Sequence, residues 1–359
     1  MSLKMKSKPS IGLDIGHYTI KLVMLDRSPQ GWKVHTSLSA LTPPNSVRDG
    51  SVVDVAAVAA TIKGLLKRAG LKNAAAHVSV AGASVVMRNV RIPKMNEQTL
   101  RKSIRFEAGR YVPNSPEDSY IEFEILGDTE DGQMDVLIVA APKQLVDSRL
   151  QACTMAGVEV ESVDLEPFAA FRALVEANQG IDIANDTIAL IDIGAYTTQV
   201  SVIHKGNFAI TRTINQGGNN LTDALQRYFK LTFEDAEEGK MQLDVRALLD
   251  DTKPTENPPL RVLQPQLDEL IREMRRSLNF YQSQQTEAGA GGNLSWMLVS
   301  GGGAKLPGIA DYMSGRLGLK VYPGCILDNP RFSGLSEEIA TGPEVSVASG
   351  LAMRAHKAA

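Results

Sequence analysis

Residues 14–19 read Asp-Ile-Gly-His-Tyr-Thr, and residues 192–197 read Asp-Ile-Gly-Ala-Tyr-Thr. Five of the six positions match, and the two copies start 178 residues apart in a chain of 359. Apolar runs flank both copies, at residues 11–13, 20–25, 188–191 and 199–204. The pattern predicts a strand, a tight turn and a second strand in each half of the chain, with Gly16 and Gly194 where the backbone reverses.

The residue types in these turns suit a phosphate. A tight turn of small residues can point several backbone N–H groups at one anion. Asp14 and Asp192 cannot bind phosphate themselves, but each could hold Mg²⁺ through water, and the metal would bridge to phosphate. A single Asp-x-Gly motif is most often a plain hairpin turn. Two copies half a chain apart favour a clamp that holds a polyphosphate from two sides.

The composition excludes several classes of protein. Lys and Arg number 38 and Asp and Glu number 41, so the net charge is −3. This balance argues against a nucleic-acid binder that works through bulk positive charge. The two cysteines exclude a disulfide scaffold, and no run approaches the ~18 apolar residues of a membrane span. We therefore expect a cytoplasmic protein of about two globular domains, without a transmembrane span.

Hydrophobic periodicity predicts the other elements. Helices are expected over residues 51–71, 96–109, 143–155, 219–229, 234–240 and 265–285, and Asn96 suits the N-cap of the second. Strands are expected over residues 77–86, 120–126, 134–141, 158–165, 208–214 and 296–299. A further helix is expected to begin at Glu166-Pro167, because proline suits a first helical turn. The small-residue face of 344–359 predicts packing against the first domain rather than a membrane anchor.

Glycines at two junctions in the second half indicate further ligand contacts. The pair Gly217-Gly218 precedes a predicted helix, so its N–H groups and the helix dipole suit a phosphate. An ordinary strand–helix turn is the alternative for this pair. The triplet Gly301-Gly302-Gly303 follows a predicted buried strand, where a nucleotide commonly approaches the backbone closely. The chain contains no Walker A loop.

The order of these elements resembles the superfamily of actin, Hsp70 and sugar-kinase ATPases. The resemblance implies an α/β fold in which two RNase-H-like, actin-like domains flank a nucleotide cleft that binds ATP and Mg²⁺. By position, Asp14, Gly16 and Lys21 match its first phosphate motif, and Asp192, Gly194 and Thr198 match the second. Gly217 and Gly218 match a pair of glycines that contacts phosphate. Glu237 and Lys240 match the residues that contact ribose and adenine, and Gly301, Gly302 and Gly303 match the adenosine motif. Glu166 matches the residue that positions the attacking water in hydrolysing members.

Within that superfamily the chain resembles the PilM family of type IV pilus assembly. The opening 11–16 followed by Lys21-Leu22-Val23 is PilM-like, as are Arg105-Phe106-Glu107 and Tyr111-Val112-Pro113. An insertion over 77–163 in β-α-β-β-α-β order is similar to the subdomain that PilM and the division protein FtsA carry. The expected units are a first core subdomain at 9–76, 164–187 and 340–359, a partner-binding insertion at 77–163, a second core subdomain at 188–230 and 296–339, and a ribose-contacting helical subdomain at 231–295.

This resemblance implies a cytoplasmic ATP-binding adaptor of the pilus assembly platform, peripheral to the inner membrane, with at most weak ATPase activity. Its expected partner is the N-terminal cytoplasmic peptide of a PilN-like membrane protein, held in a groove between the insertion and the first core subdomain, near helix 96–109 and strand 77–86. Other platform and motor components, and further copies of the chain, are additional expected partners. Two alternatives stay open: an active ATPase or kinase, for which Glu166 keeps hydrolysis open, and an FtsA-like filament-forming division protein.

Overall fold

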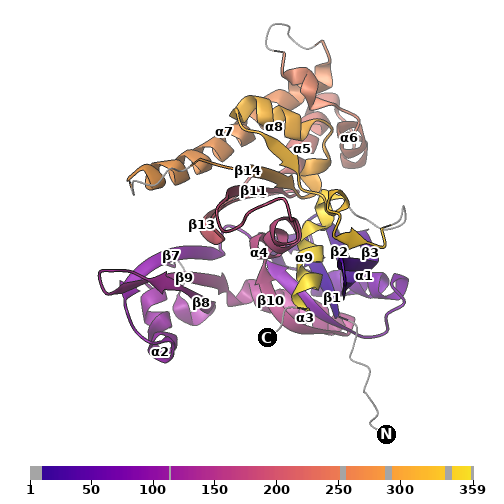
Figure 1. The fold of residues 1–359 in the computed structure, drawn as a ribbon. Helices are drawn as coiled ribbons and strands as arrows, with labels where there is room; N and C mark the ends of the chain where they lie inside the picture. Colours follow the sequence, from indigo (N-terminus) through magenta and orange to yellow (C-terminus); the bar gives the residue numbers. More distant parts are fainter. Residues whose placement is uncertain (1–9, 113–114, 251–255, 288–292, 336–341, 357–359) are drawn as a thin grey trace.

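The structure, a computed structural model, describes residues 10–112, 115–250, 256–287, 293–335 and 342–356. Two sheet-centred α/β halves face each other, and a smaller sheet with one helix projects from the first half (Figure 1). Each of the two copies of the repeated motif connects the first two strands of one half. The predicted strand–turn–strand arrangement of both copies is therefore confirmed.

The first half is built on a six-stranded sheet of order β10-β6-β1-β2-β3-β16. Its strands are β1 (Ser10–Ile15), β2 (Thr19–Ser28), β3 (Gly31–Leu41), β6 (Ala74–Val80), β10 (Val158–Leu165) and β16 (Phe332–Ser333). The pair β1–β2 is antiparallel, whereas β1–β6 and β6–β10 are parallel. A short hairpin of β4 (Val47–Arg48) and β5 (Ser51–Val52) follows β3. Strands β3 and β16 were not predicted from the sequence.

Helices cover both faces of this sheet. One face buries Ile11, Leu13 and Ile15 of β1 against α1 (Val55–Arg68) and α3 (Lys143–Ala156). The other face packs on α4 (Glu166–Phe171) and α9 (Ser346–Arg354). Gly12 is required there, because an added Cβ would overlap the carbonyl oxygen of Ala348 in α9. The C-terminal helix therefore packs on the first half, as its small residues predict.

The second half is built on a five-stranded sheet of order β13-β12-β11-β14-β15. Its strands are β11 (Thr187–Ile193), β12 (Thr198–His204), β13 (Asn207–Ile214), β14 (Trp296–Ser300) and β15 (Val321–Pro323). Its helices are α5 (Gly218–Phe229), α6 (Phe233–Lys240), α7 (Pro258–Glu287) and α8 (Ile309–Leu317). Helix α7 begins seven residues before its predicted start at Pro265, because the Pro258-Pro259 pair suits a helix N-terminus.

The inserted sheet differs from the expected β-α-β-β-α-β unit in its outer strands. It contains β7 (Val86–Pro93), β8 (Ser119–Asp128) and β9 (Gln133–Pro142) in the order β7-β9-β8, with α2 (Glu97–Ala108) packed against it. The first and last strands of the expected order are β6 and β10, which belong to the six-stranded sheet. The strand predicted over 77–86 is confirmed only as far as Val80, where β6 ends, because Gly82 with φ +123° breaks the extended backbone.

The helix of the insertion agrees with its prediction. Asn96 caps α2 by accepting a hydrogen bond of 2.8 Å from the backbone N–H of Thr99. Leu100 and Ile104 are buried against the inserted sheet, whereas Phe106 is exposed. Pro113, quoted above in the turn after this helix, lies outside the described residues. None of the described helices combines the length and the apolarity that crossing a membrane requires.

Candidate functional site

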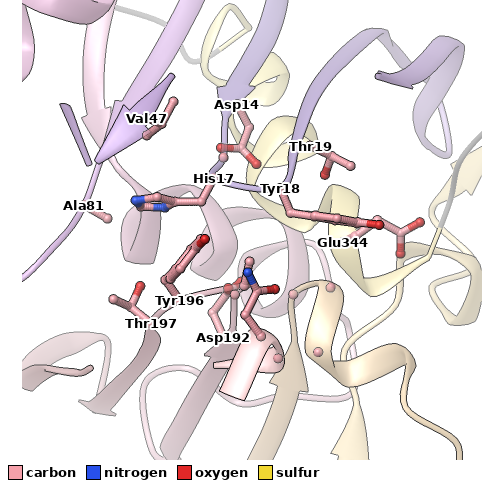
Figure 2. Close-up of a pocket in the computed structure, with 18 of the residues that line it drawn as sticks. Asp14, His17, Tyr18, Thr19, Val47, Ala81, Asp192, Tyr196, Thr197 and Glu344 are labelled. Carbon is pink, nitrogen blue, oxygen red and sulfur yellow. The ribbon is translucent and has the colours of Figure 1, made fainter. Parts of the chain in front are cut away.

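A cavity of about 890 Å³ lies between the two halves, where the turns of the two hairpins face each other (Figure 2). Most of the predicted site residues line it: Asp14, Gly16, Lys21, Glu166, Asp192, Gly194, Gly218, Glu237, Lys240, Gly301, Gly302 and Gly303. Thr198 and Gly217 do not. The hydroxyl of Thr198 instead donates to the carbonyl of Gln216 at 2.8 Å, within the second half.

The first hairpin carries a buried ion pair. Its turn is closed by a bond of 3.1 Å from the N–H of Gly16 to the carbonyl of Thr19. Asp14 and Lys21 are direct cross-strand partners, and Lys21 Nζ lies 2.9 Å from Asp14 Oδ2. Burial lowers the pKa of Lys21, but the carboxylates of Asp14, Asp192 and Glu166 outweigh this effect and raise it above its ordinary value. Lys21 is therefore a fixed positive charge on the cavity wall.

The second hairpin repeats the turn without the ion pair. The N–H of Gly194 donates to the carbonyl of Thr197 at 2.9 Å. Asp192 Oδ2 accepts a hydrogen bond of 2.9 Å from the hydroxyl of Ser300, at the end of the neighbouring strand β14. Burial raises the pKa of Asp192, and the hydrogen bond from Ser300 opposes the rise only in part.

Glu166 brings a third carboxyl group to the cavity. It is the first residue of α4, directly after β10, and its side chain lines the cavity with those of Asp14 and Asp192. Burial, followed by the negative charge of Asp14, raises the pKa of Glu166 to about 8. In the absence of a further cation, Glu166 is therefore mainly protonated at neutral pH.

These carboxyl groups suit a hydrated divalent cation. Asp14 and Asp192 each use Oδ2 in the contacts above, and none of the residues that the structure describes donates to Oδ1 of either, which leaves these atoms for water or metal. Within the described part of the chain, no three carboxylates, histidines or cysteines are close enough to form a metal site by themselves. Mg²⁺ commonly keeps several waters and uses only one or two carboxylates together with phosphate oxygens. The residues present fit that mode of binding.

The N–H groups of Gly217 and Gly218, which the sequence predicts to face a phosphate, are both used within the protein. Gly218 donates to the carbonyl of Gly194 at 2.9 Å, and Gly217 donates to the side-chain oxygen of Asn220 at 2.9 Å. A Cβ on Gly217 would lie 2.6 Å from the carbonyl oxygen of Gly194. In this structure the glycine pair therefore lets α5 pack directly against the second hairpin.

The triple-glycine loop packs against the same hairpin. Gly301 has φ +84°, and an added Cβ would lie 2.5 Å from the carbonyl oxygen of Ile193. A Cβ on Gly303 would overlap the side chain of Ile193, whereas one on Gly302 would meet open space. The outer two glycines thus hold the loop against β11, and the middle one leaves its cavity side open.

Helix α6 adds a polar corner to the cavity. Lys240 Nζ lies 2.6 Å from Glu237 Oε2 and 2.9 Å from Thr222 Oγ1 of α5. Burial lowers the pKa of Lys240, although Glu237 opposes the change. The charged helix predicted over 234–240 is therefore confirmed, and its Glu237 and Lys240 side chains face the cavity.

Three features of the cavity were missed by the sequence analysis. The ring of His17, at the tip of the first hairpin, lies 5.2 Å from that of Tyr196 at the tip of the second, and Figure 2 shows the two side chains between the hairpin turns. Tyr18 approaches Phe233 of α6 at 6.2 Å. The repeated motif could have indicated that the residues at the tips of the two hairpins face the cavity. Arg149 of α3 also lines the cavity, but nothing in its sequence neighbourhood distinguishes it from a surface arginine.

Comparison with known proteins assigns this geometry to a family. The family model of the type IV pilus assembly protein PilM matches residues 12–356. The solved structure of a PilM-PilN type IV pilus biogenesis complex is similar with a TM-score of 0.82 and 27% sequence identity, over 98% of this chain and 99% of that chain.

Other proteins are similar over all or part of the chain. MreB5 of Spiroplasma citri, solved bound to AMPPNP, is 14% identical with a TM-score of 0.51, over 96% of this chain and 95% of that chain. The cell division protein FtsA of Bacillus subtilis (strain 168) is 30% identical over 111 residues, which span 31% of this chain and 24% of FtsA. The predicted actin-like α/β fold is thus confirmed, and the chain belongs to the family of the type IV pilus assembly protein PilM.

Proposed function

We propose that this chain is an ATP-binding adaptor of the type IV pilus assembly platform, acting at the cytoplasmic face of the inner membrane. The cavity closed by the two hairpins and the triple-glycine loop carries this proposal. The polyphosphate would lie between the Gly16 and Gly194 turns beside Lys21, and the adenosine would lie along Gly302 and α6. The fold of MreB5, solved with AMPPNP, supports a nucleotide in such a cleft.

Mg²⁺ would accompany the nucleotide and neutralise its phosphate charge. Asp14 and Asp192 would orient it through water with their Oδ1 atoms, to which no described residue donates a hydrogen bond. The test is nucleotide occupancy of the purified protein: Asp14→Ala and Asp192→Ala should each abolish ATP co-purification. Wild-type occupancy in both variants would contradict the site.

A second cavity, of about 710 Å³, offers a groove for a partner peptide. It lies between β7 of the inserted sheet and β13 of the second half, and the start of α4 also lines it. Both strands are edge strands of their sheets, and they are linked by a side-chain bond of 2.7 Å from Asn89 to the carbonyl of Phe208. Strand edges suit an extended peptide, because their free backbone groups can pair with it.

We propose that this groove takes the N-terminal cytoplasmic peptide of a PilN-like membrane protein. The likeness to a PilM-PilN complex supports the kind of partner. The region overlaps the part predicted from sequence, since residues 80–83, 85 and 86 line it, but α2 contributes none of its residues and the second wall, β13, belongs to the second half rather than to the first. We also propose, from the family resemblance, that the chain binds other platform and motor components and associates with further copies of itself.

Calorimetric titration with such a peptide tests the groove. Val86→Glu and Ile210→Glu place a charge on its two walls and should each weaken binding at least about tenfold, because an unpaired charge would have to be desolvated. Leu41→Glu is the matched control, since Leu41 is 66% exposed and does not line the groove. Equal affinity of all three variants would place the peptide elsewhere.

Slow ATP hydrolysis is a second candidate function, because Glu166 faces the cavity beside Asp14 and Asp192. A phosphate-release assay distinguishes an adaptor from an ATPase. An adaptor should release negligible phosphate without its partner, whereas steady phosphate release by the protein alone would indicate an ATPase, even well below the usual ~1–10³ per second of enzymes. Glu166→Gln should remove whatever turnover is measured and leave ATP binding intact.

A further inference from the structure

Arg149 is a buried cation at the wall of the nucleotide cavity. Its residue exposure is 2%, and it lies in the middle of α3. Its Nε donates to the carbonyl of Gly50 at 3.0 Å, and its Nη1 donates to the carbonyls of Ile15 and Ser79 at 3.1 and 3.0 Å. Among the residues that the structure describes, no carboxylate lies within ion-pair distance of the guanidinium.

One donor group of Arg149 remains for a ligand. No described residue accepts a hydrogen bond from Nη2, although the side chain lines the same cavity as Lys21 and Glu166. A guanidinium keeps its charge when buried and prefers to donate to anionic oxygens. A buried charge without a counter-charge is costly, and a phosphate in the cavity would supply one.

The residues beside Arg149 connect the cavity to the inserted sheet. Asp147 accepts a hydrogen bond of 2.9 Å from the hydroxyl of Tyr120 on β8. Ser148 accepts one of 3.0 Å from the backbone N–H of Val52 on β5. Strand β9 ends at Pro142 and α3 begins at Lys143, so no loop separates the inserted sheet from this helix. Three consecutive residues of α3 thus contact the inserted sheet, the first half and the cavity.

We propose that Arg149 is a positioning residue that couples a phosphate in the cavity to the orientation of the inserted sheet. The inference rests on the proposed function, because it takes ATP as the source of the phosphate. A phosphate oxygen on Nη2 would hold the guanidinium against Ile15 and Ser79, fix α3 on the first half, and restrain β8 through Asp147 and Tyr120. By linkage, a partner that restrains the inserted sheet binds ATP-loaded protein more tightly, and ATP binds partner-loaded protein more tightly by the same factor.

Hydrogen exchange of the full chain with and without Mg²⁺-ATP tests this coupling. In the wild-type protein, saturating Mg²⁺-ATP should slow amide exchange several-fold in α3, β8 and β9. Arg149→Gln should weaken ATP binding about tenfold through loss of a charge-assisted bond, and should abolish the slowing in β8 and β9 even at saturating ATP. Arg149→Lys should restore part of the affinity but little of the slowing, because an ammonium cannot span the same carbonyls.

Tyr120→Phe separates coupling from folding. Tyr120 is 47% exposed, so this variant should fold normally, keep its ATP affinity within about twofold, and still lose the slowing in β8. Arg227→Gln is the control for removing an arginine, because the Arg227 side chain is 80% exposed on α5. If Arg149→Gln does not fold, the Tyr120 variant decides the matter alone.

The outcomes distinguish the inference from the proposed function. Wild-type protein that binds no ATP would overturn the proposed function, and the coupling with it. Wild-type protein that binds ATP but shows unchanged exchange in β8 and β9 would overturn the coupling alone. The same holds if Tyr120→Phe, or a folded Arg149→Gln protein saturated with ATP, keeps the wild-type slowing in β8.

Discussion

The two hairpins have the same backbone hydrogen bond in their turns but differ in the side chain that faces their aspartate. In both, the N–H of the glycine donates to the carbonyl three residues later, at 3.1 Å in the first and 2.9 Å in the second. In both, the residue seven positions after the aspartate is its cross-strand partner. That partner is Lys21 in the first hairpin and Gln199 in the second, so only the first hairpin carries its own counter-charge.

This difference assigns separate electrostatic roles to two nearly identical sequences. Asp14 is already neutralised by Lys21 at 2.9 Å. Asp192 receives one neutral hydroxyl from Ser300, and burial raises its pKa. The side-chain oxygen of Gln199 accepts a bond of 3.1 Å from Thr213 within the sheet. We therefore expect the second hairpin to depend on a bound cation and the first to depend on its lysine.

The largest effect is expected from Lys21→Met. It would leave Asp14 buried without its partner, which typically costs about 3–5 kcal/mol when a buried ion pair loses one member. Urea unfolding of the nucleotide-free protein measures this change, and ATP co-purification should be lost as well. Gln199→Met is the matched variant of the second hairpin and should cost about 1 kcal/mol, the typical contribution of one neutral hydrogen bond. Similar losses in both variants would show that the hairpins are electrostatically equivalent.

A smaller effect is expected in the triple-glycine loop, which packs on the second hairpin only. Gly303→Ala would force a methyl group into the side chain of Ile193 and should cost about 1–3 kcal/mol by overpacking. Gly302→Ala meets open space and should leave the free energy of unfolding within about 0.5 kcal/mol. Thermal unfolding of the two variants without nucleotide gives the comparison. A destabilised Gly302→Ala protein would mean that the loop lies differently against β11.

The repeat allowed much of this comparison to be predicted from sequence. Spacing and alternation determined both hairpins, and the aspartates at their strand ends were assigned to the cleft. The register that opposes Lys21 to Asp14 follows from a two-residue turn, because such a turn fixes which residues face each other.

Other features depend on contacts between distant segments. Ser300 reaches Asp192 across 108 positions of the chain, and Arg149 bonds to Ile15 across 134. The engaged N–H groups of Gly217 and Gly218 also escaped prediction, because their acceptors include the carbonyl of Gly194 in another element. The strand predicted over 77–86 extends too far, beyond the end of β6 at Val80, because alternation alone did not reveal that Gly82 has positive φ.

Neutralising the two aspartates tests the cation directly. Asp192→Asn should keep the bond to Ser300 and the stability of the nucleotide-free protein within about 1 kcal/mol. It should lower the gain in ATP affinity that Mg²⁺ provides by about tenfold, since one charged contact to the hydrated ion is lost. Asp14→Asn should instead lower stability, because it leaves the Lys21 charge buried and unpaired. ATP titrations with and without Mg²⁺ measure the first effect, and urea unfolding measures the second. Equal stability of the two nucleotide-free variants would contradict the division of roles.

The smallest expected effect is the pH dependence of the nucleotide-free protein. The pKa of Glu166 is raised to about 8 by burial, so the folded state binds a proton that the unfolded state has already lost above its ordinary pKa. The contribution of this group to stability is therefore complete below about pH 4.5 and is lost as the pH rises through 8.

Wild-type protein should lose at least about 1 kcal/mol between pH 5 and pH 8, or about 2 °C in Tm, whereas Glu166→Gln should lose less. Mg²⁺-ATP should remove most of the difference at pH 8, because the cation favours the ionised carboxylates. An equally steep decline in Glu166→Gln and in the wild-type protein would show that Glu166 is already ionised in the folded state over this pH range.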